Sequence, residues 1–309
     1  MPLNRHYSNM KTKKNSIKKT KGDIALEVLF YIFITIFSLL CLYPFYQVLI
    51  SSFTDENTLV REGYKLFPSK LSLDAYKTIF SNNVIPRAYL VTIFITVVGT
   101  VLTLIVTGLA AYALSGKKLK YRGGISLFFY FTCLFSGGLV AYYLLITNYL
   151  HLDNSIWVYI IPAMFNVWNM FLLRNFFNEI PMSLIESAKM DGANELTIAF
   201  RIVLPLSLPA LATIGLFTAL GFWNEWMASS LYIDDEKLYT LQYIIVRMVN
   251  SISAAQNVGQ AGLPPGVISV PANTIRLATA MVTVGPIILL YPFLQKYFVK
   301  GLRVGGVKE

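Results

Sequence analysis

Residues 186–193 read ESAKMDGA and combine acidic, small and glycine residues in one short charged stretch. Acidic side chains near helix ends cap the helix or pair with a positive charge. A glycine can take the left-handed backbone conformation that ends a helix. This composition predicts a turn between two short helices that another protein grips. It offers no nucleophile beside a base, so the expected role is mechanical.

Groups that carry out covalent or metal chemistry are scarce in the rest of the chain. There are two histidines and two cysteines among 309 residues, and Cys41 and Cys133 both lie in apolar stretches. We find no Ser/His/Asp or Cys/His arrangement, no metal-ligand spacing and no glycine-rich phosphate loop. The sequence therefore predicts a protein that is not an enzyme, with no catalytic residue, no metal site and no cofactor of its own.

Composition places the chain in the membrane class. Hydrophobic residues make up 55% of the sequence and charged residues 14%, whereas a soluble domain has roughly 25% charge. A helix needs about 20 apolar residues to span a bilayer, and spans in lipid must pair their own backbone groups. We predict an all-α membrane protein with six transmembrane helices. The apolar blocks are 24–50, 87–114, 125–147, 155–177, 204–232 and 274–298.

Polar residues inside such blocks are candidates for function. The fourth block is interrupted by Pro162, Asn166, Trp168 and Asn169. The fifth contains Trp223, Asn224, Glu225 and Trp226, and the acid would lie roughly 10 Å below the outer end of its span. Aromatic rings, amides and a carboxylate suit sugar recognition. The candidate substrate path therefore consists of Asn166, Asn169, Trp223, Asn224, Glu225 and Trp226. Alternatively, Glu225 pairs with a neighbouring span and the tryptophans anchor the membrane interface.

The distribution of Lys and Arg predicts the orientation of the chain. Segments 1–23, 115–124, 174–203 and 296–309 hold 18 of the 26 Lys and Arg residues. With six spans, the N- and C-termini both lie in the cytoplasm. The net charge of +10 then reflects the membrane topology and requires no nucleic-acid partner. The lysine-rich tail is expected to be disordered and solvated, and contact with anionic lipid heads is the alternative.

Segment 179–203 falls on the cytoplasmic side in this topology. Pro181 suits the first turn of a helix, and Gly192 is expected to end it. A second helix is expected from residue 193 to 203, with Asp191 fixing its start, and Pro205 marks the return to the membrane. An ordinary amphipathic loop on the membrane surface is the alternative.

A stripe of five threonines follows the second block at spacings of 4, 4, 3 and 4, which puts them on one helix face. We expect this face to pack against other spans, in preference to lining a pore. These residues are Thr92, Thr96, Thr100, Thr103 and Thr107. A short surface helix is expected near residue 241, with Asp234, Asp235 and Glu236 capping its start.

The stretch Glu186-Ser187-Ala188-x-x-Asp191-Gly192-Ala193, followed by Ile202-x-Leu204-Pro205, resembles the EAA loop of bacterial ABC importer permeases. That family pattern reads E-A-A-x-x-D-G-A and then I-x-L-P, and only Ser187 departs from it. The run at 223–226 and the ending at 295–301 resemble stretches of the smaller permease of maltose-type carbohydrate importers. The branch that serves complex oligosaccharides is the most similar.

The resemblance implies a type I ABC importer permease fold over residues 24–305, after a basic tail at 1–23 and before a cytoplasmic end at 306–309. It implies a coupling loop at 179–203 that docks into an ATP-binding subunit. The implied partners are a second, homologous permease, two ATPase subunits that bind ATP and Mg, and an extracytoplasmic sugar-binding protein. The coupling residues by resemblance are Glu186, Ser187, Ala188, Asp191, Gly192, Ala193, Leu204 and Pro205.

Three alternatives remain open from the sequence. An ABC permease for another solute shares the loop but is expected to lack the tryptophan run and the C-terminal pattern. A stand-alone secondary transporter typically has internal repeats and buried ion-coupling acids; the chain shows no convincing repeat and one deep acid. A membrane enzyme is disfavoured by the missing catalytic groups.

Overall fold

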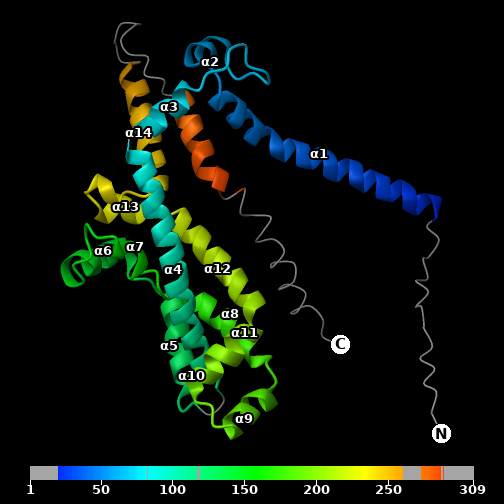
Figure 1. The fold of residues 1–309 in the computed structure, drawn as a ribbon, viewed down its shortest axis with the longest axis vertical. Coiled ribbons are helices and arrows are strands. Elements are labelled where there is room, and N and C mark those ends of the chain that lie inside the picture. The colour runs from blue at the N-terminus through cyan, green and yellow to red at the C-terminus, as the bar shows by residue number, and fades with distance from the viewer. Residues whose placement is uncertain (1–19, 82, 117–118, 260–272, 287, 289–309) are drawn as a thin grey trace, which may run out of the picture. The chain divides into compact units, whose positions relative to one another are not determined.

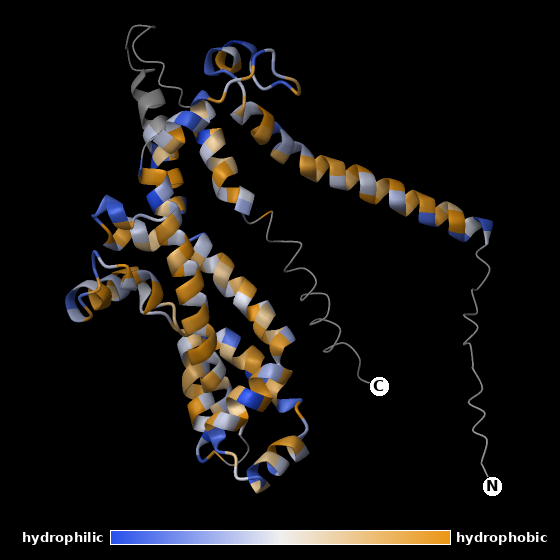
Figure 2. Ribbon diagram, in the orientation of Figure 1, coloured by the Kyte–Doolittle hydropathy of each residue, from blue (hydrophilic) through white to orange (hydrophobic). Residues whose placement is uncertain are grey.

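The computed structural model describes residues 20–81, 83–116, 119–259, 273–286 and 288. The chain divides into two units, Met1–Val48 and Leu49–Glu309. The first contains most of α1 (Lys21–Ser52), a helix of 32 residues that is apolar along its length (Figure 2). This helix confirms the first predicted block. The rest of the tail predicted at 1–23, residues 1–19, lies outside the described residues.

The second unit is built from helices in its described residues (Figure 1). One isolated β-bridge joins Thr54 and Leu71. The helices are α2 (Glu56–Glu62), α3 (Asp74–Ser81), α4 (Val84–Ser115), α5 (Arg122–Leu134), α6 (Gly138–Leu144), the π-helix η1 (Leu145–Tyr149), α7 (Trp157–Ile160), α8 (Val167–Asn178), α9 (Met182–Met190), α10 (Glu195–Ile198), the π-helix η2 (Ala199–Val203), α11 (Leu204–Leu206), α12 (Leu208–Trp223), α13 (Met227–Tyr232), the 3₁₀-helix η3 (Glu236–Leu238) and α14 (Leu241–Gly259). A further helix covers 273–286.

The described residues contain two helices, α1 and α4, that are long and apolar enough to cross a membrane, or up to four if each of two bent helix pairs counts as one span. The six predicted spans are therefore not all found. Part of the sixth block, 287 and 289–298, lies outside the described residues. α4 has 32 residues and is about 48 Å long, which exceeds a bilayer core of roughly 30 Å.

Two predicted spans are strongly bent. The third block bends by 110° between α5 and the α6–η1 helix, where Gly138 has a φ of +81°. The fifth bends by 83° between the α10–α11 segment and α12. Pro209 lies in the first turn of α12, and a proline has no N–H to continue a helix across that turn. The sequence analysis predicted spans in these two blocks but not their bends, because hydropathy does not record backbone breaks.

The fourth block consists of two short helices, α7 and α8, separated by a turn. Pro162 lies in that turn, and Asn166 caps α8 by accepting a hydrogen bond from the Asn169 backbone N–H at 2.9 Å. The polar residues that weaken the apolar pattern thus mark the place where the helix is interrupted.

Helix α4 is the centre of the second unit and packs against α8, α12 and α14. One apolar cluster lies at its Val84 end and includes buried Ile85, Ile95 and Leu241. Another lies at its Ser115 end and includes buried Ala111 and Met170. Helix α4 thereby connects the two ends of the unit.

Glycines let α4 and α12 approach closely. A Cβ on Gly99 would lie 2.6–2.8 Å from ring carbons of Phe222, and one on Gly215 would lie 3.2 Å from Leu104 Cδ1. Carbon atoms in good contact are roughly 3.5–4.0 Å apart, so the Phe222 ring occupies the space that a side chain at position 99 would need.

The threonine stripe of α4 packs as its spacing predicted. Thr92, Thr103 and Thr107 are buried. Thr92 Oγ1 accepts a hydrogen bond from the Leu241 backbone N–H at 3.0 Å, so it ties the start of α14 to α4. Thr103 additionally lines the cavity described below.

The surface helix predicted near residue 241 is α14, a helix of 19 residues. Its start is capped by Thr240, whose hydroxyl oxygen accepts from the Tyr243 backbone N–H at 3.4 Å. The predicted acidic cap of this helix was wrong, because Asp235 instead caps η3 through the Lys237 backbone N–H.

Candidate functional site

Helix α9 ends in a Schellman motif at Gly192. The Gly192 N–H donates to the Lys189 carbonyl at 3.1 Å, and the Ala193 N–H donates to the Ala188 carbonyl at 2.9 Å. Gly192 has a φ of +80°, which is the left-handed region that this motif requires. The prediction that Gly192 ends the first helix is confirmed.

The second helix of the loop starts later than predicted. α10 begins at Glu195, and the side chain of Asn194 caps it by accepting from the Thr197 backbone N–H at 2.7 Å. Asp191 is instead the C-cap of α9. The prediction that Asp191 fixes the second helix start was wrong, because Asn194 lies at the right distance for an N-cap and Asp191 precedes the turn.

Glu195 connects the loop to α4. One carboxylate oxygen accepts a hydrogen bond from the Tyr112 hydroxyl at 2.6 Å, and the other pairs with Lys189 Nζ at 2.5 Å. Tyr112 belongs to α4, Lys189 to α9 and Glu195 to α10. This carboxylate therefore joins three helices at the Ser115 end of α4. Sequence reasoning missed it, although Lys189 and Glu195 lie on opposite sides of the predicted turn, where their charges can meet.

Segment 179–203, which the resemblance identifies as a coupling loop, has an inner face and an outer face. Ala188 and Ala193 are half-buried and pack against the cluster at the Ser115 end of α4. In contrast, Met190 is 88% exposed and Leu196 is 63% exposed. Glu186, Ser187, Asp191 and Gly192 are exposed as well. The small alanines thus fit the chain's own core, while the exposed apolar side chains are the ones available to a partner.

Leu204 and Pro205 lie in the short helix α11, between η2 and the bend at Ser207. Leu204 is half-buried, and its Cδ2 atom would lie 3.4 Å from a Cβ on Gly108 of α4. Pro205 is exposed. The second half of the motif therefore holds the segment after the coupling loop against α4.

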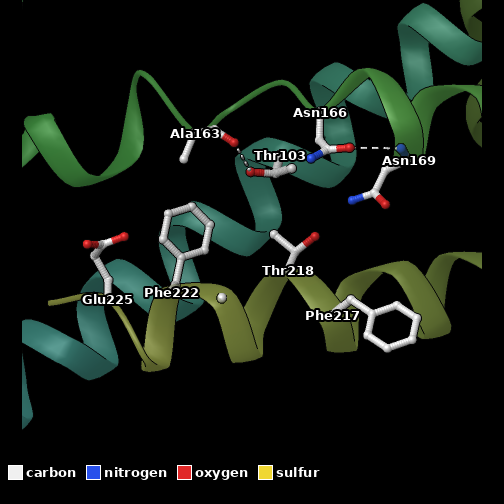
Figure 3. Close-up of a pocket in the computed structure, with 9 residues that line it drawn as sticks. Thr103, Ala163, Asn166, Asn169, Phe217, Thr218, Phe222 and Glu225 are labelled. Atoms are coloured by element: carbon white, nitrogen blue, oxygen red, sulfur yellow. Dashed lines mark hydrogen bonds between the residues drawn. The ribbon is translucent and has the colours of Figure 1, made fainter. Parts of the chain in front are cut away.

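A cavity of about 380 Å³ lies farther along α4, between α4, α8 and α12 (Figure 3). Small-molecule sites commonly have volumes of roughly 300–1,000 Å³. Figure 3 shows the amides of Asn166 and Asn169 on one side of this cavity, with Thr218 and Glu225 on the other. The lining residues are Thr103, Ala163, Asn166, Asn169, Phe217, Thr218, Gly221, Phe222 and Glu225.

Several polar groups of this lining have unused hydrogen-bonding capacity. The Asn166 side-chain oxygen caps α8, which leaves its amide nitrogen as a donor. Thr218 Oγ1 is buried and has no hydrogen-bond partner. These donors and acceptors stand beside the rings of Phe217 and Phe222. A ligand with hydroxyl groups and apolar faces has the matching chemistry.

Glu225 lies in the break between α12 and α13, one residue past the C-cap of α12. Its Oε1 atom accepts from the Ala228 backbone N–H at 2.8 Å, near the start of α13. The expectation that Glu225 sits within a continuous span was wrong, because α12 ends at Trp223. Glu225 is half-buried and borders the cavity.

Trp223, Asn224 and Trp226 do not line the cavity. Trp223 is 8% exposed and meets Tyr89 edge to face, with ring centroids 6.3 Å apart. Asn224 accepts from Gln242 Nε2 at 2.9 Å and donates to the Leu220 carbonyl. Trp226 is 41% exposed. Of the six residues predicted for the substrate path, the cavity brings together Asn166, Asn169 and Glu225.

Sequence reasoning missed the α12 side of the lining. Residues 218, 221 and 222 recur at spacings of 3 and 1, which places them on one face of α12, and Glu225 follows three residues later. Extending the stripe backwards from Glu225 would have found Thr218 and Phe222. Nothing in the sequence marks Ala163, whose carbonyl accepts a 3.5 Å hydrogen bond from Thr103.

Apolar helices around a polar cavity, with an exposed helix pair at one end, define a subunit of a membrane transport system. The chain belongs to the family described as "Binding-protein-dependent transport system inner membrane component", whose family model matches residues 16–304.

Similar proteins agree with this assignment. The "Polygalacturonan/rhamnogalacturonan transport system permease protein YtcP" of Bacillus subtilis (strain 168) is 41% identical over 286 residues, covering 91% of this chain and 98% of the relative. "Protein LplC" of the same organism is 36% identical, covering 95% of this chain and 98% of that protein.

The fold also matches a solved structure. The crystal structure of a bacterial ABC transporter involved in the import of the acidic polysaccharide alginate contains a chain that matches with a TM-score of 0.79 and 29% identity. The match covers 92% of this chain and 100% of that chain. The type I ABC importer permease fold implied by the EAA-like stretch is thereby shown.

Proposed function

We propose that this chain is the permease subunit of an ATP-driven ABC importer that takes up a carbohydrate, most specifically an oligosaccharide. The observation that carries the proposal is the pairing of two features on one helix. Helix α4 borders a polar and aromatic cavity through Thr103 and bonds the coupling loop through Tyr112. The names of the similar permeases, which include arabinooligosaccharide and trehalose/maltose systems, support a sugar as cargo.

The proposed orientation places the coupling loop and both termini in the cytoplasm. The Lys and Arg distribution supports it, and so does the exposure of Met190 and Leu196 on the loop. Apolar side chains on a charged loop suit a cleft in a soluble partner. ATP binding would close two ATPase subunits, which hold the ATP and Mg, and closure would move α9 and α10.

The cavity supplies one wall of the proposed sugar path. A second, homologous permease would supply the opposite wall, and an external binding protein would deliver the sugar. The unpaired groups of Asn166, Asn169 and Thr218 would take sugar hydroxyls, and the rings of Phe217 and Phe222 would cover apolar faces of the sugar. This chain would perform no chemical step.

Reconstitution of the assembled importer in proteoliposomes tests the function. We expect ATP hydrolysis and uptake to rise with an oligosaccharide and its binding protein. Stimulation by a polyamine or phosphate with no response to any sugar would instead identify a permease for another solute. Uptake that follows a proton gradient without ATP would identify a secondary transporter and refute the proposal.

Gly221 tests the cavity separately. A Cβ at this position would meet no atom within 4 Å, so Gly221→Leu would extend into the cavity without overpacking the helix interface. We expect lost uptake, with preserved assembly and ATP turnover. Gly221→Ala is the matched control and should transport normally. Wild-type uptake by Gly221→Leu would remove the cavity from the sugar path.

A further inference from the structure

Two arginines meet where α5 packs against α8, near the Ser115 end of α4. Arg174 Nη1 donates a hydrogen bond of 2.9 Å to Ser126 Oγ. Ser126 lies four residues after Arg122, so the two share one face of α5. The Arg174 guanidinium therefore lies about one turn from Arg122, and the two positive charges repel each other.

Neither guanidinium has an acidic partner in the described part of the chain. The Nε atoms of Arg122 and Arg174 are buried and have no hydrogen-bond partner. The sequence outside the described residues holds one acidic residue, Glu309. Each guanidinium has about five N–H donors, and Ser126 provides a single hydroxyl acceptor. Buried donors without partners are costly, so this arrangement calls for an anion with several acceptor oxygens.

The start of α5 adds to the positive potential. Its N-cap residue, Tyr121, has a φ of +63° and makes no side-chain cap. The Arg122 N–H donates to the Leu119 carbonyl at 3.4 Å, and no side chain of the N-cap covers the N–H groups of Gly123 and Gly124. Helix N-termini favour negative charge, yet Arg122 is the first residue here. A Cβ on Gly123 or Gly124 would meet no atom within 4 Å, so the space beside these N–H groups is open.

The surroundings indicate a lipid as the source of the anion. Ile125 and Tyr130 flank the arginine face of α5 and are 36% and 53% exposed. Tyr121 is 73% exposed, as expected of a tyrosine at a membrane interface. A lipid whose phosphate lies at the arginines has acyl chains that can run along these apolar side chains. A protein acid alone would leave them uncovered.

We propose that Arg122 and Arg174 bind the phosphate of an anionic phospholipid in the cytoplasmic leaflet. Guanidinium groups match phosphate oxygens in charge and geometry, and the cytoplasmic leaflet supplies such lipids. The inference rests on the proposed orientation for the leaflet, but the site itself is independent of transport. A lipid bound here would hold α5 against α8, immediately before the coupling loop.

The test measures lipid binding to the purified full-length chain, with whichever subunits co-purify, in a neutral detergent. Palmitoyl-oleoyl phosphatidylglycerol and the matching phosphatidylcholine are titrated, and bound lipid is counted by native mass spectrometry. Each basic residue at an anionic surface contributes roughly fivefold in affinity, so Arg122→Gln/Arg174→Gln should bind phosphatidylglycerol roughly 30-fold more weakly. Lys70→Gln/Lys77→Gln removes equal charge elsewhere and should bind like the wild type.

The other outcomes overturn the proposal. Equal phosphatidylglycerol binding by the wild type and the arginine variant excludes the site. If inorganic phosphate prevents phosphatidylglycerol binding as effectively as added phosphatidylglycerol does, the arginines bind free anions. If the arginine variant loses a co-purified subunit while its lipid binding is unchanged, the arginines pair with an acidic group of that subunit. If the double variant does not fold, each single variant should bind roughly fivefold more weakly, and no loss in either refutes the idea.

Discussion

The left-handed backbone of Gly192 predicts a specific loss of coupling when this residue is replaced. Gly192 has a φ of +80°, and a Cβ there would meet no atom within 4 Å. The expected cost of alanine is therefore backbone strain alone, roughly 1–2 kcal/mol for an L-residue in this conformation. Asparagine tolerates the left-handed region better, so Gly192→Asn should lose less than Gly192→Ala.

This cost is large for the coupling loop. Helix α9 has nine residues and none of them is buried, and isolated helices below about 12–15 residues are marginal in water. The Schellman hydrogen bonds and the Lys189–Glu195 pair hold the loop. If the strain falls entirely on the loop, 1–2 kcal/mol lowers the equilibrium constant for folding of the loop by roughly 5- to 30-fold.

The assay compares uptake and ATP hydrolysis in proteoliposomes, with assembly checked by size-exclusion chromatography. We expect Gly192→Ala to reduce sugar uptake while the complex still assembles. Gly63 provides a comparison, because it also ends a helix with a positive φ, +73°, and nothing lies within 4 Å of its Cβ position. Its ψ of −166° lies in a region that is essentially restricted to glycine. Gly63→Ala therefore carries at least as much backbone strain away from the loop and should retain coupling.

A tryptophan at position 192 distinguishes backbone strain from steric interference with a docked partner. Since the space around Gly192 is open in this chain, Gly192→Trp should cost little more than Gly192→Ala unless a partner approaches this point. A far greater loss of coupling with tryptophan would indicate close approach by the ATPase. Wild-type uptake by both variants, or equal losses for Gly63→Ala and Gly192→Ala, would refute the reasoning.

Three further predictions follow from other contacts. Glu225→Gln should keep the hydrogen bond to α13 and most uptake, whereas Glu225→Ala should lose roughly 0.5–2 kcal/mol of local stability and the carboxylate of the cavity; unchanged uptake in the alanine variant would exclude both roles. Gly99→Ala should displace the Phe222 ring and cost about 1–3 kcal/mol of unfolding free energy, measured by thermal unfolding, and Gly99→Ala/Phe222→Leu should recover part of it. Asn194→Ala should reduce coupling by removing an N-cap worth about 1 kcal/mol, with Asp191→Ala less damaging; the reverse order in ATP-driven uptake would contradict the capping assignment.

Local motifs were predictable where chemistry and backbone conformation depend on adjacent residues. Gly192 was expected to end a helix because glycine can take the left-handed backbone conformation of a helix end. The structure shows Gly192 in that conformation. Asn194, however, competes with Asp191 for the cap, and the sequence alone does not show which residue has the extended backbone of an N-cap. Asn194 has it, with φ −77° and ψ 164°.

Long-range placement was less predictable. Apolar content locates α1 and α4, since a long run without breaks can form only a helix in lipid. The same criterion fails for the fifth block, where Pro209 bends the chain and α12 ends before Glu225. Trp223 seemed suited to sugar stacking, yet it packs with Tyr89, because tertiary contacts decide which side of a helix faces the core.

Helix α4 offers a physical route from the coupling loop to the cavity. Tyr112 bonds Glu195 of the loop, and Thr103, nine residues earlier, lines the cavity; along a helix this is about 14 Å. A second route runs through η2 and α11 to the bend at Ser207 and then to α12. A π-helix is rare and frequently marks a functional site, which distinguishes η2 on this second route. A movement of the loop can then rotate α12 about the bend while Tyr112 holds α4 in place, which widens or narrows the cavity between them.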